Sequence, residues 1–224
     1  MQTTLAHGVR YAETHPVDID IAANPTPRNR LTSAFRVVLA LPHILLVGGP
    51  MALGVSLMWH DATEPHVEWG GAGVLGAVAM VAAIIGWFAI VFGARYPDGL
   101  WNLAAFYMRW RVRAIAYLTL LRDEYPPFGE AAYPATIRLE APTSPRDRLT
   151  VAFRPILALP HIVALWVLGI AWALATLIAW LMILFTARYP QPLYDFSVGV
   201  FRWTTRVEAY LLLLRDEYPP FGLH

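Results

Sequence analysis

The chain contains two copies of one sequence pattern, and this internal repeat constrains its fold more than any other feature. The copies share short motifs in the same order, and two offsets relate them. At an offset of 118 the matches are Arg-Leu-Thr (30–32 and 148–150), Ala-Phe-Arg (34–36 and 152–154) and Leu-Pro-His (41–43 and 159–161). At an offset of 93 they are Ala-Arg-Tyr-Pro (94–97 and 187–190), Arg-Trp (109–110 and 202–203) and Leu-Arg-Asp-Glu-Tyr-Pro-Pro-Phe-Gly (121–129 and 214–222). The first copy therefore has 25 additional residues between His43 and Ala94.

The composition indicates that lipid is the main solvent of this chain. Of its residues, 57% are hydrophobic and only 15% are charged. Cysteine and lysine are absent, which excludes disulfides, thiolate metal sites and a Schiff-base lysine. A net charge of +1 excludes a strongly basic nucleic-acid-binding protein. Residues 1–10 lack the layout of a cleaved signal peptide, so we expect the first spanning helix to direct insertion.

Each copy opens with a short stretch of alternating character. Val17, Ile19 and Ile21 alternate with aspartates, and Ile137 and Leu139 alternate with polar residues. This period of two predicts a strand with one buried face in each copy, and the two strands could pair as a small cap. Proline-rich turns follow, and helices are expected to start near the two Arg-Leu-Thr motifs.

Apolar segments of the first copy predict a helical hairpin. Residues 37–59 and 73–92 each have about the ~20 residues needed to cross hydrocarbon, and a polar loop at 60–68 separates them. In the second copy, residues 153–186 are nearly continuous, so they form either one long tilted crossing or two short helices that turn near Gly169. No arginine lies in the first loop, and a second hairpin keeps all arginines on the cytoplasmic side. We therefore favour four crossings.

The last long segment of each copy, 100–121 and 193–214, has arginines at its centre. These residues would be costly in the middle of a bilayer. Their combination with tryptophan and tyrosine predicts an amphipathic helix that lies at the cytoplasmic membrane surface.

The order of these motifs resembles a bacterial membrane-protein family catalogued as domain of unknown function 4389. The chain is similar to a tandem version of that family, with copies over 16–129 and 134–222 and an extra outer loop at about 59–72. The family has no established reaction, substrate or cofactor, so the resemblance implies membrane location and architecture only. The expected fold is an all-α integral membrane protein. It has two copies of a module with a helical hairpin and an interfacial helix, each preceded by a short β-strand.

Two histidines at equivalent positions are the sharpest candidates for chemistry. His43 and His161 each follow Leu-Pro near a membrane boundary. Paired imidazoles in helices can ligate haem or a metal. The alternative is that each ring bonds a backbone carbonyl freed by the adjacent proline. No catalytic residue set can be assigned from the sequence.

Arginine and aromatic side chains form the second group of candidates. Eight arginines are predicted to bind lipid phosphates, or else to pair within the chain: Arg30, Arg36, Arg109, Arg113, Arg148, Arg154, Arg202 and Arg206. The Tyr-Pro-Pro-Phe tails could dock a partner through Tyr125, Phe128, Tyr218 and Phe221, or could fold back to cap their own modules.

The sequence therefore favours a non-enzymatic membrane scaffold or accessory subunit that binds phospholipid, a partner membrane protein or a second copy of itself. The alternatives are a haem- or metal-binding redox protein that uses His43 and His161, and a small transporter or channel. The expected location is the bacterial cytoplasmic membrane, with several crossings and both termini in the cytoplasm.

Overall fold

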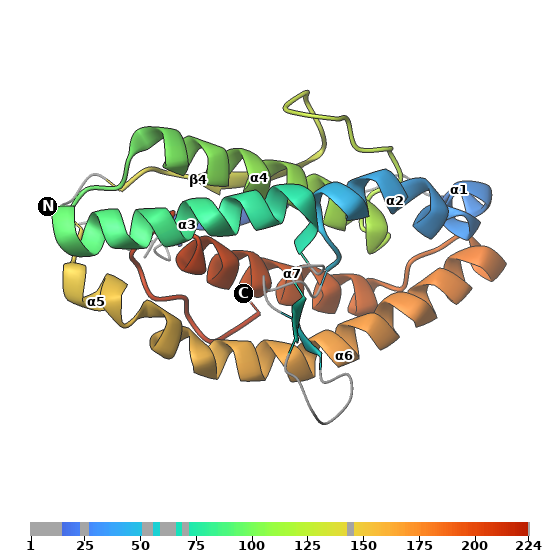
Figure 1. Cartoon of the computed structure of the whole chain (residues 1–224). Helices are drawn as coiled ribbons and strands as arrows, with labels where there is room; N and C mark the ends of the chain where they lie inside the picture. Colours follow the sequence, from blue (N-terminus) through green and yellow to red (C-terminus); the bar gives the residue numbers. More distant parts are fainter. Residues whose placement is uncertain are drawn as a thin grey trace, which may run out of the picture.

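The computed structural model describes residues 15–22, 27–50, 56–58, 66–68, 72–142 and 146–223, which are mostly helical (Figure 1). Its helices are α1 (Arg30–Ala34), α2 (Arg36–Val47), α3 (Gly73–Gly93), α4 (Asp98–Leu118), α5 (Arg148–Ala152), α6 (Arg154–Thr186) and α7 (Gln191–Leu211). Its strands are β1 (Val17–Ile21), β2 (Ser56–Met58), β3 (His66–Glu68) and β4 (Ala135–Leu139).

The longest element, α6, is one unbroken helix of 33 residues. The predicted turn near Gly169 was therefore wrong. One glycine costs a helix only about 1 kcal/mol, and the residues on both sides of Gly169 continue the apolar pattern. Gly169 itself is buried, so the helix passes through this position with its packed face intact.

The helices α2 and α3 of the first copy lie end to end and reproduce the course of α6 (Figure 1). A Cβ atom at Gly73 would lie only 2.6 Å from the backbones of Leu46 and Gly48, so the start of α3 touches the end of α2. The 12 residues of α2 and the 21 residues of α3 together have the length of α6. We call the α2–α3 pair the first rod and α6 the second rod.

The extra residues of the first copy leave the first rod after Val47 and return to it at Gly73. The predicted hairpin of two crossings was therefore wrong here as well, because α2 ends at Val47, where Gly48 has a φ of 77°. Most of the predicted polar loop at 60–68 lies outside the described residues.

Helices α4 and α7 and strands β1 and β4 form two further layers behind the rods (Figure 1). The middle layer contains α4, which packs on the first rod, and α7, which packs on the second. The third layer is the antiparallel pair of β1 and β4, with Val17 opposite Leu139, which contacts α7 and α4. The predicted pairing of the two strands is confirmed. The arginine-rich helices α4 and α7, which the sequence predicts at a membrane surface, have about half of their residues buried in this arrangement.

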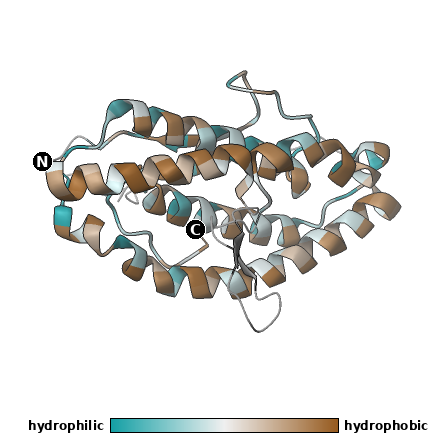
Figure 2. Cartoon of the chain, viewed as in Figure 1, coloured by the Kyte–Doolittle hydropathy of each residue, from teal (hydrophilic) through white to brown (hydrophobic). Residues whose placement is uncertain are grey.

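The outer faces of both rods are apolar and exposed (Figure 2). Exposed apolar side chains recur along the second rod from Phe153 to Phe185, where Phe185 is 77% exposed, and along the first rod to Phe92, which is 74% exposed. Helices α3 and α6 are long and apolar enough to cross a membrane, as judged by length and composition.

Candidate functional site

Arg36 and Arg154, predicted either to bind lipid phosphates or to pair within the chain, are buried and paired where their rods begin. Nη2 of Arg36 donates to Oδ1 of Asp123 at 2.6 Å, and Nη2 of Arg154 donates to Oδ1 of Asp216 at 2.7 Å. Each guanidinium also lies over a tyrosine ring and donates to backbone carbonyls. With 1% exposure, both groups fasten the rod to the tail of their own copy and are not available to a lipid phosphate.

Arg28 and Arg146 complete these two clusters and were not among the predicted site residues. Nε of Arg28 lies 3.0 Å from Asp123, and Nε of Arg146 lies 3.4 Å from Asp216. Both also donate to the carbonyl of a leucine with positive φ, Leu120 or Leu213. The sequence contains a sign of their shared role, because Arg28 and Arg146 are related by the same offset of 118 as the motifs beside them.

Four arginines of α4 and α7 pair with groups on the side of the molecule where β1 and β4 lie. Arg109 pairs with Glu130 at 2.7 Å, and Arg202 pairs with Asp18 at 2.8 Å. Arg113 donates to the carbonyl of Gly129, and Arg206 donates to the carbonyl of Val17. These four side chains bind the tail of the first copy and β1, and they lie behind the rods rather than on their apolar faces.

His43 and His161 lie in two separate aromatic cages. Nε1 of Trp110 donates to Nδ1 of His43 at 3.1 Å, and Nε1 of Trp203 makes the same bond to His161 at 3.1 Å. The caging tyrosine and phenylalanine come from the Tyr-Pro-Pro-Phe tail of the same copy, and Phe221 stacks on His161 with centroids 4.0 Å apart. The tails Tyr125–Phe128 and Tyr218–Phe221 therefore fold back onto their own modules.

The hydrogen bond from tryptophan fits poorly with haem or metal ligation. An indole N–H only donates, so Nδ1 of each histidine must accept, and the proton of a neutral ring lies on Nε2. A metal bond through Nε2 would require that proton to move to Nδ1, where the indole N–H already points. Within the described part of the chain, no three His, Asp or Glu side chains gather as a metal site requires.

Four exposed arginines lie at the two ends of the rods. Arg30 on α1 reaches the C-terminal end of α6, where it donates to the carbonyl of Phe185 at 3.2 Å, and Arg188 follows the same end. Arg95 follows the C-terminal end of α3 in the chain. Arg148 lies near the same end because its helix, α5, packs on α3. Cations are favourable at helix C-termini, where unpaired carbonyls gather. Each end of the apolar face thus carries two accessible guanidinium groups.

One buried polar network joins α4 to α7 at the centre of the molecule. Nε of Arg111 donates to Oε2 of Glu208 at 2.7 Å, and the hydroxyl of Tyr107 donates to Oε1 at 3.0 Å. The same guanidinium donates to the carbonyl of Val47. The network satisfies its charges internally, and its contacts are those of a structural link between the copies.

These features define a mostly helical protein with two helices of membrane-spanning length and an exposed apolar face. The chain belongs to the family described as domain of unknown function 4389, whose model matches residues 70–129 and 148–222. The family resemblance seen in the sequence motifs is thereby confirmed. No curated protein and no solved structure gave a significant match.

Proposed function

We propose that the protein is a non-enzymatic membrane scaffold or accessory subunit that binds phospholipid through the apolar face of its two rods. The main support is the row of exposed apolar side chains along the 33-residue helix α6, which is about 50 Å long. Soluble monomers rarely expose apolar patches beyond a few hundred Å². Acyl chains would cover this face without requiring any polar partner.

The three layers support a placement in which both rods lie along the membrane plane. Helices α4 and α7 and the strands run beside the rods, so rods that crossed the bilayer would take Asp18, Arg138 and the open strand edges into hydrocarbon. The second rod is also longer than the ~30 Å hydrocarbon core. In the flat placement, the rods enter one leaflet as interfacial helices do, and the polar layers face water.

This placement replaces the four crossings expected from the sequence. It keeps the expectation that both ends of the chain lie on one side of the membrane. Strand β1 and the C-terminal tail belong to the polar side, so the two ends of the described chain share one aqueous compartment. We assign it to the cytoplasm, where arginine-rich surfaces meet anionic lipid. The exposed arginines at the rod ends then lie at headgroup height, each worth about 1 kcal/mol of attraction.

Vesicle flotation tests the lipid-binding proposal. The purified chain should float with phosphatidylglycerol vesicles, and R30Q/R148Q should bind them roughly 30-fold more weakly, as expected for two lost charges. The control R109Q/R138Q removes the same charge from the strand side and should bind like the wild type. Equal loss in both variants, or no flotation of the wild type, would refute the proposal.

Cysteine labelling tests the placement, because the chain has no cysteine of its own. Single cysteines at Ile156, Leu174 and Phe185 sample the two ends and the middle of the exposed face of α6. Flat rods predict that all three resist a water-soluble maleimide in reconstituted vesicles, whereas a cysteine at Arg138 reacts. Reaction of positions 156 and 185 from opposite sides of the bilayer would show that α6 crosses it.

A partner membrane protein or a second copy is the other candidate occupant of the apolar face. Mild-detergent purification separates the cases, because a stoichiometric protein that shields the α6 cysteines in the absence of lipid favours the accessory-subunit form. The redox alternative predicts a Soret band or bound metal in the same preparation, and the Trp203–His161 hydrogen bond counts against it.

A further inference from the structure

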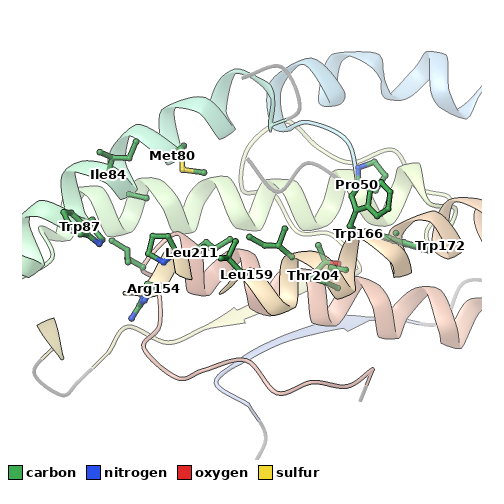
Figure 3. Close-up of a pocket in the computed structure, with 16 residues that line it drawn as sticks. Pro50, Met80, Ile84, Trp87, Arg154, Leu159, Trp166, Trp172, Thr204 and Leu211 are labelled. Atoms are coloured by element: carbon green, nitrogen blue, oxygen red, sulfur yellow. The ribbon is translucent and has the colours of Figure 1, made fainter. Parts of the chain in front are cut away.

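A cavity of about 620 Å³ lies between the two rods, with α7 as its floor (Figure 3). Its walls are mainly apolar and include Met80, Ile84 and Trp87 from α3 and Leu159, Trp166 and Trp172 from α6. Ile84 and Trp166 are 45% and 64% exposed, whereas Trp172 is 2% exposed. The cavity therefore opens between the apolar faces of the rods and reaches into the interior.

The cavity is long in the direction of the rods. Arg154 and Trp172 both line it, and they are separated by about 27 Å along α6 at 1.5 Å per residue. In Figure 3 these two side chains lie toward opposite ends, with Leu159 and Thr204 between them. A long apolar channel of this kind has the form of an extended hydrocarbon chain.

One residue that lines the cavity, Trp172, has a buried hydrogen-bond donor without a partner. Nε1 of Trp172 is buried, and no acceptor among the described residues bonds it. By contrast, Trp87, Trp180 and Trp203 each donate to an acceptor of the protein. A buried donor left unpaired destabilises a folded protein. Ala79 occupies the matched position of the first copy, so this indole is not part of the repeated framework.

Apart from the largely exposed indole of Trp166, the other polar side chains of the lining are committed to the protein. Thr204 donates to the carbonyl of Val200, and Arg154 is held by Asp216. Nε of Arg154 lacks a partner, but so does Nε of Arg36, which does not line the cavity. An occupant must therefore be mostly hydrocarbon and supply one acceptor oxygen. A peptide would bring many backbone groups that this lining leaves unsatisfied.

We propose that the cavity holds one acyl chain of an ester-linked membrane glycerolipid, whose ester carbonyl accepts a hydrogen bond from Nε1 of Trp172. The inference deepens the proposed function and rests on it, because rods that lie at the boundary of headgroups and acyl chains bring the cavity to the level of the esters. The second acyl chain and the headgroup of the lipid stay in the surrounding leaflet.

Native mass spectrometry of the full chain in mild detergent tests this site. The delipidated protein is reloaded with dioleoyl phosphatidylglycerol or with its diether analogue, which lacks the ester carbonyls. L159W places bulk in the cavity at a residue that is 53% exposed, and V163W is the matched control one turn away, at 66% exposure and outside the lining. W172F removes the indole N–H and keeps an aromatic ring.

The wild type and V163W should each retain one diester lipid, and L159W should lose it. W172F should bind the diester lipid roughly three- to tenfold more weakly and the diether lipid as well as the wild type does. Retention by L159W, an equal effect of W172F on both lipids, or preference for free oleate over the diester would overturn the proposal. Circular dichroism of each variant verifies the fold.

Flotation of the same variants separates this proposal from the proposed function. L159W and W172F should float with vesicles like the wild type, because both variants keep the exposed face of the rods apolar. A wild type that retains one lipid in detergent but does not float would refute the membrane scaffold and leave the cavity as a lipid site.

Discussion

Nη1 of Arg111 donates to the carbonyl oxygen of Val47 at 2.8 Å, at the residue where α2 ends. The last carbonyls of a helix lack partners within it, so this bond satisfies one that the end of α2 leaves open. The second copy has no such end, because α6 continues, and Thr204 stands at the position that matches Arg111. Ile115 likewise stands at the position that matches Glu208. The buried ion pair therefore occurs where the rod is interrupted.

Loss of one partner of this ion pair should lower the free energy of unfolding much more than replacement of both partners. R111A leaves Glu208 buried without its cation and should destabilise the protein by about 3–5 kcal/mol. R111T/E208I introduces the residues of the matched positions and should recover most of that loss. Chemical denaturation in mild detergent, followed by circular dichroism, measures both variants. Equal stability of the single and double variants would contradict this account.

Removal of residues 48–72 should join α2 and α3 into one continuous helix. The joined segment would have the length of α6, and the ends already touch at Gly48 and Gly73. Combined with R111T/E208I, the deletion should keep the helical signal at 222 nm per chain while the chain loses 25 residues. A large drop in that signal, or a chain that aggregates, would show that the segment is needed for folding.

The His161 cage should behave as a structural hydrogen bond. H161L leaves the buried N–H of Trp203 without its acceptor and should cost about 1–3 kcal/mol. W203F removes the donor as well, so H161L/W203F should cost less than the sum of the two single changes. A double-mutant cycle of unfolding free energies measures this coupling. A visible absorption band or a bound metal that disappears in H161L would instead favour the redox alternative.

Tyr96 should weaken the fold at alkaline pH. Burial raises the pKa of Tyr96 to about 12, although the Arg146 guanidinium near its ring acts in the opposite direction. Between pH 10 and 12 the unfolded chain releases this proton and the folded chain keeps it, so stability falls as pH rises through this window. The contribution is about 2 to 3 kcal/mol. Y96F should show a flatter decline of unfolding free energy from pH 9.5 to 11.5, and an unchanged slope would exclude this role.

Local patterns predicted the parts of this fold that depend on neighbours in the chain. The alternation around Val17 and Ile137 predicted two strands and their pairing, which the register confirms. Helix starts were predicted near the two Arg-Leu-Thr motifs, and Asn29 and Asp147 cap α1 and α5. The predicted segments at 100–121 and 193–214 correspond to α4 and α7 within three residues at each end.

Features that depend on distant residues could not be predicted in this way. The carboxylate that holds Arg36 inside the protein is Asp123, 87 residues away, so the hydropathy of the rod gave no sign that the arginine is buried. The hairpin of the second copy was inferred from the rule that arginines stay on one side of the membrane, which assumes that the apolar segments cross it. In the proposed placement along the membrane plane, the apolar segments do not cross the bilayer, so the rule does not apply to them.

The two rods run in opposite directions and have equal length. Placed as proposed, the molecule adds cross-sectional area to one leaflet and none to the other. A bilayer relieves such an area mismatch by bending toward the enlarged leaflet, so many copies on one surface would bias that surface to be convex. Because both ends of each molecule carry the same pair of arginines, the bending effect does not depend on the direction in which a molecule points within the plane.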